Sequence, residues 1–187
     1  MNDSIAKTFS AAASDLKFAV RRRVGSRCSV TFFAKGPYDG IACTVYHDTY
    51  VAQVAEVEVT ASGQVRLLNV WCVVDPGQTV NPDGVRNQIE GGIQQSASWT
   101  LLEELRHRDG RVTTTGWDAY PIATFNDAPA SIEVLVEGDA SAPPTGVGEP
   151  GAVPTAAAIA NAVFAACGAR VRQLPLTRDR VRNATAS

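Results

Sequence analysis

Histidine and cysteine are scarce in this sequence, and their scarcity limits the chemistry that it can support. Two histidines and four cysteines occur among 187 residues. The cysteines (Cys28, Cys43, Cys72 and Cys167) are far apart and form no C-x-x-C motif. The sequence therefore predicts no metal held by side chains and no catalytic Cys–His pair, and it favours a reducing compartment.

Long apolar runs are also missing. No segment approaches the roughly 20 apolar residues that a membrane span needs, and the first 16 residues lack the apolar core of a secretory signal. We therefore expect no membrane span and a cytoplasmic location, with a periplasmic location still open for a full complex.

An excess of positive charge is absent as well. The formal net charge is -2, so the whole chain offers no electrostatic case for binding nucleic acid or an anionic membrane. The charge is unevenly distributed: residues 1–35 carry +5, residues 36–169 carry -11 and residues 170–187 carry +4. The sequence thus has an acidic middle between two basic ends.

The chain divides into three parts by pattern. Residues 1–39 form a poorly patterned basic segment, in which we expect little order apart from one marginal helix over residues 11–22 and a turn at Gly36-Pro37. Residues 40–178 carry the regular pattern of a folded domain. Residues 179–187 are expected to be a solvated tail.

From residue 40 onward the pattern predicts an α/β (α+β) architecture, with a mixed sheet and packed helices. Residues 55–59 alternate apolar and acidic side chains, which indicates a strand with one wet face. Residues 65–74 form a nearly continuous apolar run, typical of a strand buried on both faces. A further strand is expected over residues 132–136, with a weaker candidate over residues 112–115.

Two helices are expected. Asn81 as N-cap and Pro82 in the first turn predict a helix from residue 82 to about residue 105. Its face carries Gly91, Gly92 and Ser96, which indicate close approach of a cofactor or, equally, simple helix packing. The second helix is alanine-rich, spans residues 155–167 and is closed by a glycine at the next position.

The loop before the second helix contains a G-x-G-x-x-G string at residues 146–151, which resembles a dinucleotide-binding turn. Its context argues against that function. No strand runs directly into Gly146, no acidic residue follows about 20 positions later, and Pro150 removes a backbone donor.

Glu149 is the notable residue of this loop, because it is the only acidic residue between Asp139 and Asp179. Glycines and prolines around it limit the freedom of the backbone, so the carboxylate is a candidate general base. The residues alone leave a second interpretation open, in which Glu149 is a surface carboxylate that stabilises a helix dipole.

Several motifs occur together in an order that resembles the molybdopterin-binding large subunit of the xanthine dehydrogenase and aldehyde oxidase family, above all its isoquinoline 1-oxidoreductase type. They are NPDGVRNQIEGG, EEL, WDAYPI, GVGEPG, AIANAVFAA and RVRQLPLT, and they cover about residues 40–178. The resemblance implies a partial molybdopterin-binding domain of a molybdenum hydroxylase. It implies that Glu149 is the base, that Gln88 binds the pterin, and that Gly146, Val147 and Gly148 line the metal.

The resemblance also implies a reaction and partners. An aldehyde or N-heterocycle would be oxidised with water as the oxygen source. The cofactor would be molybdenum–molybdopterin, expected as the cytosine dinucleotide form, with iron–sulfur clusters on a small partner subunit. The remaining large-subunit segment would complete the site.

Three functional hypotheses stay open at this point. The chain could be one component of a split molybdenum hydroxylase, or a truncated, non-catalytic fragment that keeps the fold. A third hypothesis is an interaction module that uses the basic ends.

Overall fold

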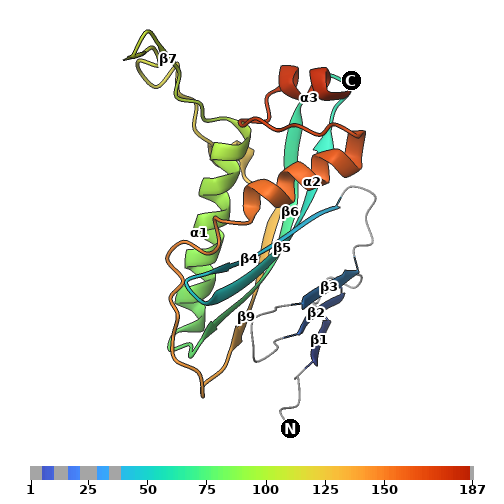
Figure 1. The fold of residues 1–187 in the computed structure, drawn as a ribbon, viewed down its shortest axis with the longest axis vertical. Coiled ribbons are helices and arrows are strands. Elements are labelled where there is room, and N and C mark those ends of the chain that lie inside the picture. The colour runs from blue at the N-terminus through green and yellow to red at the C-terminus, as the bar shows by residue number, and fades with distance from the viewer. Residues whose placement is uncertain (1–5, 11–16, 22–28, 34–38, 186–187) are drawn as a thin grey trace.

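The computed structural model describes residues 6–10, 17–21, 29–33 and 39–185 (Figure 1). Helix and strand alternate irregularly along the chain, as expected for an α+β architecture. The elements in order are β1 (Ala6–Ser10), β2 (Lys17–Arg21), β3 (Ser29–Phe33), β4 (Asp39–Tyr46), β5 (Thr49–Val59), β6 (Val65–Gly77), α1 (Pro82–Leu101), β7 (His107–Arg108), β8 (Arg111–Val112), η1 (Phe125–Asp127), β9 (Ser131–Gly138), α2 (Thr155–Cys167) and α3 (Arg178–Thr185).

A mixed four-stranded sheet is the centre of the fold. Its strand order is β4-β5-β6-β9, in which β4, β5 and β6 pair antiparallel and β6 pairs parallel with β9. The connection between the two parallel strands contains α1, because parallel neighbours require a crossover. The expected mixed sheet with packed helices is thus confirmed.

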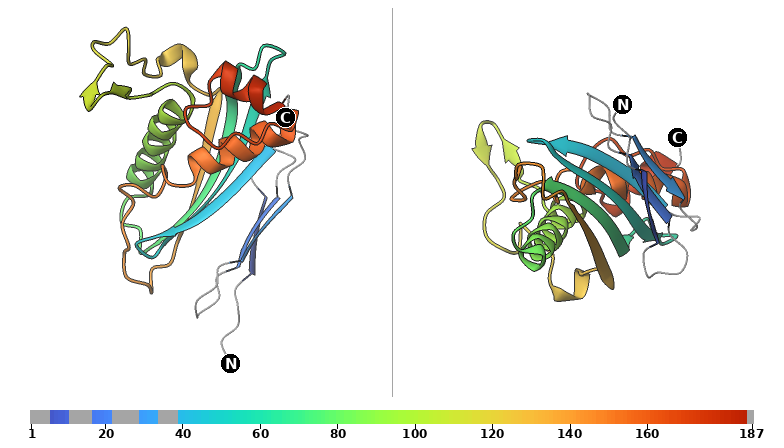
Figure 2. Two further views of the ribbon diagram at one scale, coloured as in Figure 1. Left: turned by 45° about the horizontal axis from the view of Figure 1, so that its top comes forward. Right: turned by 90° about the horizontal axis from the view of Figure 1, so that it is seen from below.

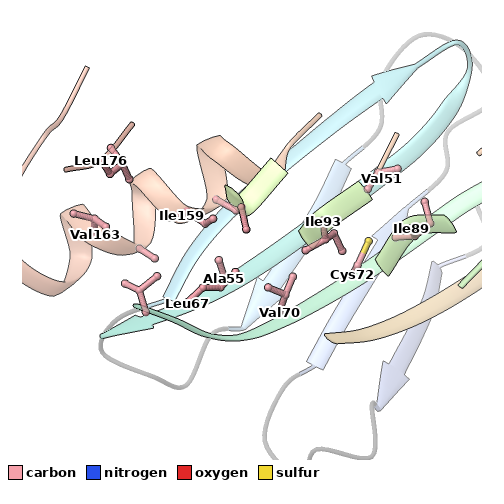
Figure 3. Packing of buried hydrophobic residues seen from close by; sticks show 14 of the residues in the cluster. Val51, Ala55, Leu67, Val70, Cys72, Ile89, Ile93, Ile159, Val163 and Leu176 are labelled. Atoms are coloured by element: carbon pink, nitrogen blue, oxygen red, sulfur yellow. The ribbon is translucent and has the colours of Figure 1, made fainter. Parts of the chain in front are cut away.

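Helices α1 and α2 lie on the same face of this sheet (Figures 1 and 2). The main core lies between them and the strands, where Val51, Ala55, Val70, Ile89 and Ile159 meet (Figure 3). Each of these side chains is at most 3% exposed. A second, smaller cluster on the opposite face is built around Val54 and Val73.

The helix boundaries match their local signals in part. Asn81 caps α1 by accepting a hydrogen bond from the Gly84 N–H at 3.1 Å, and Gly168 closes α2 with φ 75°. However, α1 ends at Leu101 rather than near residue 105. Beyond it, Glu104 pairs with Arg180 at 2.5 Å.

The strand expectations are also largely confirmed. Residues 55–59 have a buried apolar face and a wetter acidic face, and β9 covers the expected residues 132–136. The run over residues 65–74 is buried on both faces only toward its end, at residues 72–74. The weak candidate over residues 112–115 is reduced to strand β8, which ends at Val112.

Two expectations at the ends of the chain were wrong. Within the expected helix over residues 11–22, residues 17–21 form strand β2 of an antiparallel sheet with β1 and β3, and the remainder lies outside the described residues, as does the turn at Gly36-Pro37. The expected tail contains α3, in which Val181 is 1% exposed. Val181 and Ala184 pack against the main core, while Arg178 and Arg180 bind Gln64 and Glu104, so apolar and polar contacts together dock this helix. In the described part of the chain, no helix is long and apolar enough to cross a membrane.

Candidate functional site

The candidate residues of the sequence analysis gather around one loop, residues 145–151, which we call the glycine loop. It precedes α2 and contains Gly146, Val147, Gly148 and Glu149. The side chain of Val147 packs against the main core, whereas Gly148 and Glu149 are exposed. Val147 therefore holds the loop to the core, whereas Gly148 and the Glu149 carboxylate face outward.

The hairpin of β4 and β5 anchors the start of the glycine loop. The Thr49 hydroxyl is fully buried and donates to the Gly146 carbonyl at 2.7 Å. It also lies 2.6 Å from the Thr145 hydroxyl. Gly146 has φ 93°, a left-handed conformation that glycine adopts without steric cost. These contacts fix the direction in which the loop leaves the sheet.

A buried amide holds the other end of the loop. Gln53 has no exposed surface, and its Nε2 donates to the Gly151 carbonyl at 2.6 Å. The Thr155 hydroxyl lies 2.8 Å from Gln53 Oε1 and 2.9 Å from the Gly151 carbonyl. Gln53, Thr155 and Gly151 thus satisfy one another in the core, as buried polar groups must. The sequence analysis missed this group.

Helix α1 packs directly on the loop backbone. A Cβ added at Gly151 would stand 2.8 Å from the Ile89 carbonyl oxygen, and one at Gly92 would stand 3.2 Å from the Ala152 nitrogen. The small face that the sequence suggested on this helix therefore packs on the loop backbone at Gly92, and Ser96 on the same helix is buried. Gly91 is different, because it is exposed and a Cβ there would meet nothing within 4 Å.

Gln88 connects the exposed side of α1 with the same loop. Its Nε2 donates to the Gly148 carbonyl at 2.9 Å, although the two residues are 60 positions apart. Gln88 is exposed, and its amide oxygen is not used in this bond. The structure thus brings Gln88, Gly148 and Glu149 together, as the sequence analysis required of a single site.

Tyr46, at the end of β4, donates a hydrogen bond from its hydroxyl to Oε2 of Glu149. The pKa of the Tyr46 phenol is raised, first by this hydrogen bond, then by desolvation, and last by the negative charge of Glu149. Sequence reasoning missed Tyr46 because the partners lie 103 residues apart and meet only through the sheet.

The donor set of the site consists of amides, backbone groups and one carboxylate. Among the residues that the structure describes, no group of three or more histidine, cysteine, aspartate or glutamate side chains could hold a metal ion. A Cβ at Gly146 or Gly148 would meet nothing within 4 Å, so the outer surface of the loop is open.

The chain matches the family model described as "Molybdopterin cofactor-binding domain" over residues 5–129. This match begins at residue 5, whereas the resemblance inferred from the motifs begins only at about residue 40. A nicotinate dehydrogenase subunit from Pseudomonas putida is 45% identical over 136 residues, which are 72% of this chain and 11% of that protein. The beta subunit of isoquinoline 1-oxidoreductase from Brevundimonas diminuta is 35% identical over 138 residues, 73% of this chain and 17% of that protein.

A solved structure supports the same relationship. Quinoline 2-oxidoreductase from Pseudomonas putida 86 superimposes with a TM-score of 0.66 at 29% identity, covering 74% of this chain and 19% of that one. The chain therefore spans only between about a tenth and a fifth of the length of these three relatives.

Proposed function

The chain belongs to the molybdopterin cofactor-binding domain family of xanthine dehydrogenase-type enzymes, and from that premise we propose that it forms one wall of the active site of a molybdenum hydroxylase, with Glu149 as the general base. The observation that carries the proposal is the convergence of Gln88, Gly148 and Glu149 on one open, firmly anchored loop.

Glu149 suits the role of base for physical reasons. Its side chain is exposed, so a substrate can reach it, and its backbone carbonyl is fixed by a 2.9 Å hydrogen bond from the Ala152 N–H. General bases act by accepting a proton at a defined position, and a loop anchored on both sides gives that position. In the proposed reaction, the carboxylate of Glu149 would accept the proton.

Gln88 and the glycine loop would hold the cofactor. A primary amide offers both donors and an acceptor, and Gln88 uses only one donor on Gly148. The pterin would therefore contact the remaining Gln88 groups and the open backbone of Gly146 and Gly148. When bound, molybdenum–molybdopterin would supply the redox chemistry and bring its own sulfur ligands, so this chain needs no cluster of metal-binding side chains.

The finer identity of cofactor, substrate and partners belongs to the proposal as well. We expect the cytosine dinucleotide form of the cofactor, an aldehyde or N-heterocycle as substrate, and water as the oxygen source. The relatives are named as subunits. We accordingly expect the remaining large-subunit segment and an iron–sulfur small subunit as partners.

The base is tested by Glu149→Gln in the assembled enzyme, with Glu133→Gln as the control because Glu133 is an exposed acid on β9. Glu149→Gln should lower turnover by roughly a hundredfold or more and keep molybdenum content, because the amide preserves the shape of the side chain and cannot accept the proton. Glu133→Gln should keep both. Full turnover of Glu149→Gln would show that another group is the base.

The cofactor contact is tested by molybdenum analysis of the chain purified with its native partners. Gln88→Ala should lower molybdenum occupancy, whereas Gln94→Ala, an exposed glutamine on the same helix, should not. Equal occupancy in both variants would contradict the Gln88 contact. Purification of the unmodified chain without molybdenum and without a partner would instead support the alternative of a non-catalytic chain that keeps the fold.

A further inference from the structure

Tyr46 and Glu149 come from opposite ends of the described domain, and their contact is built by the β4–β5 hairpin. Tyr46 pairs with Thr49 as the last rung of this hairpin. Thr49 is itself bound to Gly146 of the glycine loop. The hairpin end therefore holds the loop at two points, with Thr49 on the backbone of Gly146 and Tyr46 on the carboxylate of Glu149.

The turn of the hairpin fixes where the Tyr46 hydroxyl lies. His47 and Asp48 have φ 47° and 65°, so both central residues of this two-residue turn are left-handed, as in a type I′ turn. Non-glycine residues adopt this conformation at a cost that the surrounding structure must offset. The His47 ring also lies edge-on to the Tyr46 ring, with 4.5 Å between centroids and an interplanar angle of 84°. The turn and the His47 ring therefore both restrict Tyr46, independently of its contact with Glu149.

An exposed glutamate ordinarily samples several rotamers, because its side chain has three rotatable bonds. A hydrogen bond from a constrained phenol to Oε2 removes much of this freedom. It also distinguishes the two carboxylate oxygens, because the Tyr46 hydroxyl stabilises negative charge on Oε2 and makes Oε1 the more basic oxygen. A phenol with the ordinary pKa of 10.0 is protonated in the neutral range, and the raised pKa of Tyr46 extends that range, so the hydroxyl remains a donor.

We propose that Tyr46 is a positioning residue, which holds Oε2 of Glu149 so that Oε1 faces the reacting group. The proposal rests on the proposed function of Glu149 as the base. In this role Tyr46 acts through its hydrogen bond to Glu149.

The contact can be tested in the chain without cofactor or partners. The four tyrosines are labelled with carbon-13 at Cζ and titrated by NMR. Two ionisable groups contact Tyr46 in the described part of the chain, Glu149 through its carboxylate and His47 through its ring, and Asp48 follows His47 in the turn. Glu149→Gln should lower the pKa of Tyr46 toward its ordinary value of 10.0, because both the carboxylate acceptor and its charge are lost.

A second tyrosine provides a matched control. The Tyr120 hydroxyl donates to Glu103 at 2.8 Å, and that carboxylate raises the pKa of Tyr120 in the same way. Glu103→Gln should therefore shift Tyr120 and leave Tyr46 unchanged, and Glu149→Gln should do the reverse. If the pKa of Tyr46 were the same in Glu149→Gln as in the unmodified chain, the proposal would be overturned.

The consequence of the contact is tested in the assembled enzyme with Tyr46→Phe. We expect kcat to fall roughly ten- to a hundredfold, since small displacements of a catalytic group have effects of this size, with KM, molybdenum content and unfolding midpoint unchanged. Tyr50→Phe is the control, because Tyr50 lies one rung further along the same hairpin, opposite Val45.

The two proposals fail in different ways. Full turnover of Tyr46→Phe, together with an inactive Glu149→Gln, overturns the positioning role and leaves the base in place. Full turnover of Glu149→Gln overturns the proposed function, and the positioning role with it, even if the Tyr46 titration responds to Glu149. A lower unfolding midpoint in Tyr46→Phe than in Tyr50→Phe would show that the hydroxyl is structural.

Discussion

Gln53 anchors one end of the glycine loop from within the core, and Gln53→Ala tests this anchor directly. The side chain has no exposed surface, and its amide joins Gly151 and Thr155 through contacts of 2.6 and 2.8 Å. Truncation to alanine removes both contacts and leaves a cavity that is closed to solvent. The substitution therefore combines two separate losses.

The size of the effect follows from these losses. Two buried hydrogen bonds contribute about 1 kcal/mol each. Removing a long buried side chain adds about 2 kcal/mol for lost packing and the cavity, at the lower end of the range for such truncations, because the apolar stem of Gln53 is short. We expect Gln53→Ala to lower the free energy of unfolding by about 4 kcal/mol. This is a large share of the roughly 5–15 kcal/mol that stabilises a typical domain.

The assay is urea unfolding followed by tryptophan fluorescence and far-ultraviolet circular dichroism. The midpoint should fall at an unchanged m-value, since the surface exposed on unfolding stays the same. Gln94→Ala is the control, because Gln94 is exposed on α1 and its loss should change stability by no more than about 0.5 kcal/mol. If Gln53→Ala were no less stable than Gln94→Ala, the loop would not be held by this buried amide.

Three further predictions follow from single features. Burial raises the pKa of the Cys72 thiol to about 12. In the native chain at pH 8, iodoacetamide should therefore modify the exposed Cys43 and spare Cys72, which site-resolved mass spectrometry would show. Rapid modification of Cys72 would contradict its burial. The two arginines paired with Glu104 lower the pKa of that carboxyl below its ordinary 4.5. Its contribution to stability is therefore present above pH 4.5 and lost as the pH falls through the lowered pKa, and the difference in unfolding midpoint between the unmodified chain and Glu104→Gln should shrink over that interval. Gly151→Ala should lower the free energy of unfolding by about 1–3 kcal/mol in the same urea assay, because its Cβ would meet the backbone of α1. A Cβ at Gly148 would meet nothing within 4 Å, so Gly148→Ala should unfold at nearly the original midpoint. Equal midpoints for the two variants would refute the close packing at Gly151.

Elements with local signals could be predicted from the sequence, and elements that depend on distant partners could not. The Asn81 cap and the Gly168 terminus depend on residues within one helical turn, and both were correct. The end of α1 has no glycine or proline to mark it, and periodicity placed it about four residues too late; Glu104 just beyond it pairs with Arg180, 76 positions away. Helix α3 was not predicted because its apolar contacts come from Val181 and the small Ala184 in an arginine-rich segment.

The candidate site shows the same division. Glu149, Gln88 and the glycine loop were identified from motifs, and the structure brings them together. Tyr46 and Thr49 carry no local signal, because their partners lie 103 and 97 positions away. Gln53 did carry a local signal in the sequence. It continues the alternation of Ala55 and Val57, and it is therefore a polar residue on the core face of its strand. Such a residue needs a buried partner, and this requirement alone pointed to a second segment.

The alternation of β5 also explains how one hairpin can anchor both ends of the glycine loop. Thr49, Val51, Gln53, Ala55 and Val57 lie on the same face of the strand, so the two loop anchors and three core residues share one register. A slip by one residue would turn all five to the other face at once. The two-residue turn at His47 and Asp48 fixes this register, and it also ends β4 at Tyr46. The Glu149 carboxylate is therefore connected to the main core through β5 and its hairpin, so an exposed functional group is held by a strand whose core-facing side chains are buried.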